Sequence, residues 1–468
     1  MNNTNLPLTT KQAVQKTLYN YPLVQKIAQQ IHQHGGQSLL VGGAVRDLLL
    51  GIEVKDLDIE IHKVSLADLE TILRMHGPIS TVGKSFGVLR LHGLDIDWSL
   101  PRADSSGRKP EVLINPNMSI ADACRRRDLT INAMAIDLIT LQLFDPFNGQ
   151  EDLIHNILRT PDPTLFIEDP LRFYRVMQFI GRFDMQPDPQ LNNLCKTMDV
   201  NTVSRERIEV EFEKLFLKSK QPSLGIRWIH SLERLNTLFP ELYALVGVVQ
   251  EPAWHPEGDV LEHTMQSLDA AAALTSYDNA TKLVLMYAAL CHDLGKPETT
   301  QLKNEKLTSY GHDDAGVPIA KKLLARITHN QGLIDAVCKL VRYHMMPGQF
   351  IKSNAKPPAY KRLANKLAPE CTMQMLADLA YADKHGRNPN SHTPLTMPLP
   401  DIDEFLKKSE GAQVRYEHEK PILLGRDIAD IIEPGPQMGE FLKRAYEIQI
   451  EQGVTDKEQL KQLVIQKR

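Results

Sequence analysis

The most constraining feature of this chain is the succession of a strand, a glycine turn and a helix between residues 38 and 51. The apolar run at residues 39–41 is typical of a buried strand, and Gly42 and Gly43 follow it directly. Residues 44–50 then predict a helix, which ends at a further glycine. Such a turn directs free backbone N–H groups and the positive end of a helix dipole at one spot, so it predicts a site for an anion such as phosphate.

The following strand carries two carboxylates on one face. Apolar and acidic side chains alternate over residues 56–62, which places Asp56 and Asp58 on the same side of the strand. Carboxylates so close together repel each other unless a cation lies between them, and Mg²⁺ takes one or two carboxylates together with substrate phosphates. Two such ions stabilise both oxygens of an in-line displacement at phosphorus. Arg46, in the preceding helix, can add a charge-assisted contact to a phosphate.

Taken alone, the Gly-Gly turn is more often only a turn, and the Asp-x-Asp strand is more often a solvated face. One short loop apart, they resemble the nucleotidyltransferase superfamily, in its class II tRNA branch of CCA-adding enzymes and bacterial poly(A) polymerases. Gly-Gly-Ala-Val-Arg-Asp at residues 42–47 and Asp-Leu-Asp at residues 56–58 carry the resemblance. It implies that the two aspartates hold two catalytic magnesium ions. It also implies that the glycine motif holds the triphosphate, through Gly42, Gly43 and Arg46.

A third carboxylate is expected on a later strand, where it would help to bind an ion or to orient the attacking 3′-hydroxyl. Asp95 and Asp97 both alternate with apolar side chains over residues 94–100. The spacing before Arg102 in the family pattern makes Asp97 the third carboxylate and leaves Asp95 facing solvent. In the family, a flexible loop in the place of residues 103–121 helps the switch from C to A addition, which favours an enzyme that adds A.

Arg-Arg-Asp at residues 126–128 is a solvated charge run or, by the same resemblance, a family motif. That motif couples the sugar and triphosphate site to the junction between head and neck. The resemblance implies this role for Arg127 and Asp128, with Asn132 as support.

Residues 169–175 open a helix in which Asp169, Arg172 and Arg175 lie near one face. As a surface ion pair they would contribute little. As a base-reading pair they would match cytosine and adenine, which both present an amino donor beside a ring acceptor, whereas uracil and guanine reverse that pattern. The resemblance extends to this motif, in which Asp and Arg act as an amino-acid template for CTP and ATP. It implies that role for Asp169 and Arg172, with Arg175 as support.

A second set of metal-ligating residue types is spread over the helical half of the chain. An adjacent His-Asp at the end of an apolar helix, with His upstream and Asp far downstream, resembles the HD phosphohydrolase superfamily. The resemblance implies a first metal held by His263, His292, Asp293 and Asp383, and a second held with His312 and His344; His255 lies near them but is not assigned. Imidazole and carboxylate ligands suit manganese, nickel, magnesium or iron. A metal-activated water would cleave phosphate esters such as a 2′,3′-cyclic phosphate at an RNA end.

Composition limits the environment and the partners. The formal net charge is −4, so any nucleic-acid surface must be a local patch. Five scattered cysteines, a polar start without signal-peptide character and the lack of an apolar run of about 20 residues predict a cytoplasmic protein without a membrane span. A basic run at residues 356–366 contains Tyr360 and is a solvated helix face or an RNA contact that stacks a base.

The predicted fold class is α+β, in five regions. These are a tail and helix at residues 1–37, a small mixed-sheet nucleotidyltransferase head at 38–150, and all-helical neck, HD and tail regions at 151–245, 246–400 and 401–468.

The predicted function is template-independent addition of CCA to tRNA 3′ ends from CTP and ATP. We expect Mg²⁺ in the head, a divalent transition metal or Mg²⁺ in the HD site, and no obligate protein partner. On the same scaffold, a poly(A) polymerase or an enzyme that adds only CC or only A remains open. The alternatives from other classes are a metal phosphohydrolase whose head merely binds RNA and a non-enzymatic binder of RNA ends.

Overall fold

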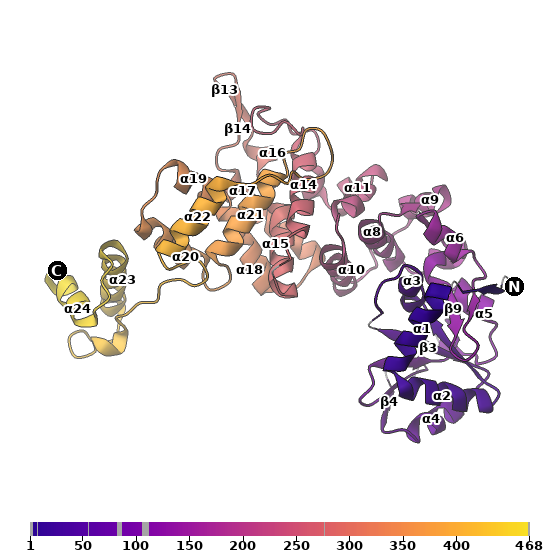
Figure 1. Ribbon diagram of the computed structural model, residues 1–468. Helices are drawn as coiled ribbons and strands as arrows, with labels where there is room; N and C mark the ends of the chain where they lie inside the picture. The colour runs from indigo at the N-terminus through magenta and orange to yellow at the C-terminus, as the bar shows by residue number, and fades with distance from the viewer. Residues whose placement is uncertain are drawn as a thin grey trace. The chain divides into compact units, whose positions relative to one another are not determined.

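The computed structural model describes residues 3–6, 8–54, 56–81, 87–104, 112–275 and 277–466. The chain divides into two compact units, unit 1 (Met1–Val203) and unit 2 (Ser204–Arg468) (Figure 1). The region predicted as a neck, residues 151–245, is therefore shared between the units. Unit 1 combines helices with a mixed sheet and unit 2 is mainly helical, which confirms the predicted α+β class.

An eight-stranded sheet forms the centre of unit 1, in the order β1-β10-β9-β2-β3-β6-β5-β4. Only β3 and β6 pair in parallel, so the sheet is mixed. The alternating pattern produces β3 because Leu57, Ile59 and Ile61 are buried on one side of the strand. Its strands are β1 (Asn3–Asn5), β2 (Gln37–Val41), β3 (Leu57–His62), β4 (Ile79–Thr81), β5 (Val88–Leu91), β6 (Ile96–Ser99), β9 (Ala135–Asp137) and β10 (Gln142–Phe144).

Two short strand pairs accompany the sheet: β7 (Arg102–Asp104) with β8 (Val112–Ile114), and β11 (Ile157–Leu158) with β12 (Gln186–Pro187). The polar loop predicted at residues 103–121 therefore contains a strand, and its residues 105–111 lie outside the described residues.

Side-chain caps fix several helix starts in unit 1. Ser65 and Ser119 each accept a hydrogen bond from the backbone N–H three residues on, at 3.1 Å, as N-cap residues do. The helices are α1 (Leu8–Asn20), α2 (Pro22–Gln33), α3 (Gly43–Leu49), α4 (Leu66–Arg74), α5 (Ile120–Arg125), α6 (Gly149–Ile154), α7 (Pro163–Phe166), α8 (Leu171–Phe183) and α9 (Pro189–Thr197), with the 3-10 turn η1 (Thr130–Asn132).

Unit 2 is built from helices, with one hairpin, β13 (Gln301–Lys303) and β14 (Lys306–Thr308), that projects from them (Figure 1). This hairpin was not predicted from the sequence. The helices are α10 (Arg205–Lys218), α11 (Ser223–Ser231), α12 (Leu235–Leu238), α13 (Pro240–Tyr243), α14 (Val260–Ala272), α15 (Asn279–Cys291), α16 (Lys296–Thr299), α17 (His312–Ile327), α18 (Gln331–Tyr343), α19 (Met346–Lys352), α20 (Pro357–Leu367), α21 (Met373–His385), α22 (Pro400–Gly411), α23 (Pro436–Gln452) and α24 (Lys457–Gln466), with the 3-10 turn η2 (Gly425–Asp427).

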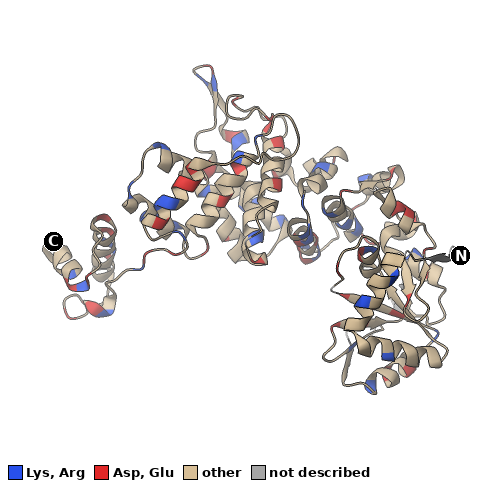
Figure 2. Cartoon of the chain, viewed as in Figure 1, with Lys and Arg blue, Asp and Glu red and all other residues tan. Residues whose placement is uncertain are grey.

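Charges of both signs are interspersed along both units (Figure 2). The basic run in α20 forms ion pairs, including Lys361 with Glu419 and Arg362 with Glu447. Tyr360 is 1% exposed, so the idea that it stacks a base is wrong: its ring packs inside the unit. Within the described ranges, every helix is too short or too polar to cross a bilayer.

Candidate functional site

A cavity of about 410 Å³ in unit 1, the head cavity, is lined mainly by charged side chains. Strands β3 and β6, the segment that follows α5 and the start of α8 contribute to it. The charged residues that line it are Asp58, Glu60, Asp97, Arg102, Arg126, Arg127, Asp169 and Arg172.

Two carboxylates meet in the head cavity because β3 and β6 run in parallel. Asp58 and Asp97 are direct partners in the register of these strands, and neighbouring strands lie about 4.8 Å apart. Asp97 accepts hydrogen bonds from Arg90, with Nε at 2.9 Å. Asp95, two residues earlier, is 86% exposed. The structure thus brings the predicted third carboxylate to the side of Asp58.

The carboxylates of the head cavity fit a divalent cation. Burial raises the pKa of Asp58, Arg127 lowers it, and Asp97 and Asp56 raise it further. Asp56 is exposed just before β3 begins. A bound cation would relieve this repulsion and favour the ionised carboxylates, and oxygen donors are the ligands that Mg²⁺ prefers.

The glycine turn is a close approach of the backbone to this cavity. Gly42 has a φ of 71°, and a Cβ there would lie 2.8 Å from Arg127 Nη1 and 3.8 Å from Asp58 Oδ2. A Cβ on Gly43 would lie 3.3 Å from Nη2 of Arg46. The first glycine is therefore needed so that Arg127 can lie against the turn.

Arg46 is not among the residues that line the head cavity. It is 4% exposed, and its Nη1 donates to Asn132 at 2.5 Å while Nε and Nη2 donate to Asp47. The guanidinium lies 5.2 and 4.8 Å from the ring centroids of Phe179 and Phe183. These contacts hold Arg46 beneath the turn, where it links α3 to η1 and α8.

Asp128 joins the Arg-Arg-Asp motif to α8. It accepts hydrogen bonds from Arg175 Nε at 2.5 Å, from Asn132 Nδ2 at 3.0 Å and from the Leu129 N–H. Burial raises the pKa of Asp128, but Arg175 and these hydrogen bonds outweigh burial and lower the pKa to about 2. The predicted residues Asp128, Asn132 and Arg175 therefore form one network around the buried carboxylate of Asp128.

The two residues predicted to read the base lie on the wall of the head cavity, Asp169 just before α8 and Arg172 in its first turn. Asp169 Oδ1 accepts from the Leu171 N–H at 3.2 Å. The Arg172 Nη atoms donate to the carbonyls of Leu165 and Arg126 at 2.8 and 2.6 Å. Both side chains are thus held at the cavity by neighbouring backbone.

Glu60 also lines the head cavity, and it was not among the predicted site residues. Glu60 accepts from His62 Nε2 at 2.8 Å and lies 3.8 Å from Arg127 Nη2. Burial raises its pKa, but His62 and Arg127 outweigh burial and lower it. Its position, two residues after Asp58 on the same strand face, is the signal that could have identified it.

In unit 2 the six predicted HD residues meet in one buried group, the HD cluster, although they come from five helices. They lie at helix starts or ends: His263 in α14, His292 and Asp293 after α15, His312 in α17, His344 after α18 and Asp383 in α21. His263 Nε2 lies 3.2 Å from His292 Nε2, and His312 Nε2 lies 3.1 Å from His344 Nε2.

Asp293 connects the two histidine pairs. Its Oδ2 lies 3.5 and 3.2 Å from Nε2 of His263 and His292, and its Oδ1 lies 3.4 and 4.0 Å from Nε2 of His312 and His344. Asp383 Oδ1 lies 3.1 Å from His263 Nε2. One carboxylate thus faces two sets of ligand atoms, as in a site for two metal ions.

Backbone carbonyls determine which nitrogen of each histidine is free. Carbonyls only accept, so Nδ1 carries the proton where it donates to Gly386, Ala289, Ser309 and Val341, at 3.0, 2.8, 2.7 and 2.6 Å for His263, His292, His312 and His344. In a neutral ring, each Nε2 would then present a lone pair to another Nε2 at about 3 Å. Facing lone pairs repel, and divalent cations between them fit this donor set.

The pKa values of the HD cluster shift in different directions. Burial lowers the pKa of His263, but Asp383 and Glu257 outweigh burial and raise it. Burial and the neighbouring histidines lower the pKa of His344 to about 3, so its ring is neutral near pH 7. Burial raises the pKa of Asp293, but His292 and Lys296 outweigh burial and hold the pKa well below its usual range. Lys296 Nζ lies 2.7 Å from Asp293 Oδ2.

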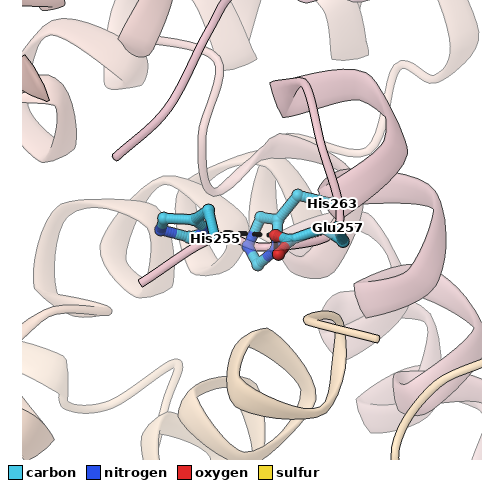
Figure 3. A group of neighbouring side chains, drawn as sticks. All are labelled: His255, Glu257 and His263. Atoms are coloured by element: carbon cyan, nitrogen blue, oxygen red, sulfur yellow. Dashed lines mark hydrogen bonds and ion pairs between the residues drawn. The ribbon is translucent and has the colours of Figure 1, made fainter. Parts of the chain in front are cut away.

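Glu257 also belongs to the surroundings of the HD cluster, although it was not among the predicted ligands. Its neighbour His255 was not assigned a role either. His263 Nδ1 lies 2.7 Å from Glu257 Oε1, and His255 Nδ1 donates to the same oxygen at 2.9 Å (Figure 3). The Glu257 side chain is 0% exposed. A carboxylate behind a metal-binding histidine fixes its ring and raises its basicity. The Trp-His-Pro-Glu motif just before α14 is the sequence signal that could have identified Glu257.

Comparisons with known proteins agree with both sites. A family model described as the Poly A polymerase head domain matches residues 38–159, and one described as the HD domain matches residues 260–382. The Multifunctional CCA protein of Tolumonas auensis is 32% identical over 366 residues, covering 75% of this chain and 85% of that protein. The corresponding protein of Neisseria meningitidis serogroup A is 35% identical over 371 residues, covering 76% and 84%.

Solved structures resemble the fold along most of the chain. The Bacillus stearothermophilus CCA-adding enzyme in complex with CTP has a TM-score of 0.64 at 19% identity, covering 95% of this chain and 96% of that one. The Thermotoga maritima CCA-adding enzyme complexed with tRNA has a TM-score of 0.58 at 20% identity, covering 95% of each chain.

Proposed function

The chain belongs to the family of multifunctional CCA proteins, and from this premise we propose that it adds C, C and A to tRNA 3′ ends from CTP and ATP in the head cavity. The observation that carries the proposal is the pairing of Asp58 with Asp97 in a cavity that Asp169 and Arg172 also line. Carboxylates for metal ions and groups complementary to a base thus share one space.

The residues of the head cavity have different proposed roles in this reaction. Magnesium ions held by Asp56 and Asp58 would neutralise charge on the attacking and leaving oxygens when bound. Asp97, beside Asp58, is placed to bind an ion or to orient the 3′-hydroxyl. Arg127, against the glycine turn, supplies positive charge for the triphosphate.

Base selection is proposed for Asp169 and Arg172. A carboxylate accepts from the amino group of cytosine or adenine, and a guanidinium donates to the ring acceptor. Arg172 would have to exchange one of its two carbonyl partners for the base. Uracil and guanine would leave polar groups unpaired, which is how a polar site rejects a wrong ligand.

The test uses purified protein, Mg²⁺ and labelled CTP or ATP with three RNAs. Addition of C, C and A to tRNA lacking CCA, of A to tRNA ending in CC, and of nothing to an unrelated oligoribonucleotide would support the proposal. A long A tail on all three RNAs would indicate a poly(A) polymerase. The lack of any incorporation would favour a phosphohydrolase whose head only binds RNA.

Two variants test the template. Asp169→Ala and Arg172→Ala should raise misincorporation of UTP and GTP relative to CTP and ATP by about 10-fold or more, since each removes one hydrogen-bonding partner of the base. Rejection of UTP and GTP that stays at the wild-type level in both variants would contradict the template.

We also propose that the HD cluster hydrolyses phosphate esters at RNA ends, such as a 2′,3′-cyclic phosphate. Asp293 and the histidines on either side of it would hold divalent metal ions, which would supply an activated water and polarise the phosphate. The facing Nε2 atoms at 3.1 and 3.2 Å carry this proposal. Lys296 balances the charge of Asp293 within the site.

The test of this second activity removes metal with a chelator and restores Mn²⁺, Ni²⁺ or Mg²⁺. Asp293→Ala should lose metal binding and hydrolysis of adenosine 2′,3′-cyclic phosphate while nucleotide addition continues. Asp314→Ala, at a carboxylate that is 71% exposed on α17, is the matched control. Hydrolysis that survives Asp293→Ala would exclude the HD cluster as the site.

A further inference from the structure

A cavity of about 500 Å³, the HD cavity, opens beside the HD cluster and has two exposed aromatic rings on its wall. Trp254 is 69% exposed and Tyr310 is 80% exposed. Aromatic rings bury a large apolar area, so two exposed rings on one cavity leave a surface that a flat ligand could cover. They line the same cavity as Asp293, His312, His344 and Asp383.

Hydrogen bonds connect the two chain segments that carry these rings, and both segments reach the predicted metal ligands. The Leu307 N–H of the β13–β14 hairpin donates to the Glu251 side chain at 3.1 Å, and the Trp254 N–H donates to the Glu251 carbonyl at 3.0 Å. The two segments that carry the rings are therefore held together. One continues to Glu257, which contacts His263, and the other contains Ser309, whose carbonyl accepts from His312.

The same cavity wall carries cationic groups at different depths. Lys352 is exposed at the end of α19, and Arg387 Nη2 donates to Asp383 at 2.7 Å. Lys296 is buried beside Asp293. The acidic residues Glu251 and Asp313 also line the cavity, so its charge is mixed rather than uniformly basic.

We propose that Trp254 and Tyr310 form a nucleobase subsite of the HD cavity, so that its ligand is a nucleoside phosphate, free or at an RNA end, rather than a base-free phosphate ester. This inference rests on the proposed phosphohydrolase function. The phosphate lies toward the HD cluster and the base stacks on the rings. Every base has a π face, so the subsite is tolerant of sequence.

The first experiment compares two substrates of one reaction on the metal-loaded full chain: adenosine 2′,3′-cyclic phosphate and glycerol 1,2-cyclic phosphate. Trp254→Ala and Tyr310→Ala should each raise KM for the adenosine substrate by about 10- to 100-fold, the range of base–aromatic stacking, with little change in kcat. Neither should affect the glycerol substrate. Trp254→Phe keeps a ring and should keep most of the affinity.

Tyr416→Ala is the matched control, since Tyr416 is 62% exposed in the same unit but does not line the HD cavity. Equal losses on both substrates would show that the rings act on the structure of the site and would overturn the proposal. Unchanged KM values in both Ala variants would overturn it as well.

The second experiment needs no hydrolysis. The chain has three tryptophans, of which Trp98 and Trp228 are 0% and 7% exposed, so quenching by acrylamide reports Trp254. Adenosine 2′-monophosphate should protect Trp254 from acrylamide, less so in Tyr310→Ala, and glycerol 2-phosphate should not. Protection without hydrolysis of either substrate would refute the phosphohydrolase function but support the subsite. Hydrolysis without protection would refute the subsite alone.

Discussion

The head cavity presents carboxylates and arginines on strands and loops, whereas the HD cluster presents imidazole nitrogens and two carboxylates near helix ends. Asp97 of the head cavity is 36% exposed, while His263, His292 and Asp293 are at most 2% exposed. Oxygen ligands open to solvent leave positions for substrate phosphates on a hard ion. Buried imidazoles favour transition metals that the protein itself coordinates.

The two sites also differ in what prepares them before a ligand arrives. In the head cavity, burial raises the pKa of Asp58, and the neighbouring carboxylates Asp97 and Asp56 raise it further, so a cation would favour the ionised form. In the HD cluster, a backbone carbonyl accepts a hydrogen bond from Nδ1 of each of the four histidines, which orients its ring with Nε2 toward the other ligand atoms. We therefore expect the head to bind metal weakly and together with nucleotide, and unit 2 to bind metal by itself.

The largest expected effect separates the two chemistries. Asp58→Ala should reduce nucleotide addition by on the order of 10³-fold, because it removes a charge-stabilising group from the reaction centre. Hydrolysis in the HD cluster should be unchanged. Initial rates of both reactions on the same preparation measure this. Asp95→Ala, at an 86% exposed carboxylate nearby, is the control, and addition that persists in Asp58→Ala would remove Asp58 from the catalytic set.

A second prediction concerns the buried network that supports the head cavity. Asp128→Asn replaces the carboxylate that accepts from Arg175 Nε by a neutral amide and should destabilise unit 1 by about 2 kcal/mol at pH 7, as the lowered pKa of Asp128 implies. The pKa of Asp128 is lowered from 3.8 to about 2 in the folded chain, so its ionised form stabilises the fold above pH 4. This contribution is lost as the pH falls from about 4 to 2.

The difference between wild type and Asp128→Asn should therefore shrink over that pH range. Urea unfolding followed by hydrogen-exchange mass spectrometry reads unit 1 separately and measures it. Asp95→Asn provides the exposed control in the same unit. A difference that stays constant down to pH 2 would show that the ionisation of Asp128 is not what stabilises the network.

The smallest effect concerns preparation of the HD cluster. Glu257→Gln removes the carboxylate behind His263 and should weaken metal binding by about 10- to 100-fold without changing the number of ions bound. Calorimetric titration of chelator-treated protein with Mn²⁺ measures both quantities. Glu298→Gln, at an exposed glutamate of the same unit, is the control. The loss of one bound ion would instead make Glu257 a direct ligand.

Much of the architecture could be predicted because its signals are local. The alternation of residues 56–62 predicted β3, which begins one residue later, at Leu57. The shared face of Asp56 and Asp58 stays a prediction, because only Asp58 lies within the strand. The Gly-Gly turn followed by a helix is present as α3, with Gly42 at a φ of 71°. Periodicity and turn chemistry act over a few residues, so they can be read without knowing the fold.

Contacts between distant segments could be decided only by the tertiary structure. Only the parallel pairing of β3 with β6 sets Asp97 beside Asp58. Arg46 was predicted from the sequence to contact a phosphate. In the structure its guanidinium is buried against the rings of Phe179 and Phe183 in α8.

The HD residues show the same division. Their types and order along the chain predicted a metal site, and the structure gathers all six. That Asp293 faces both histidine pairs, and that Glu257 lies behind His263, depends on how five helix ends converge. Residue types limit which ligands are possible, but coordination depends on distances of a few ångströms, which only the packed helices determine.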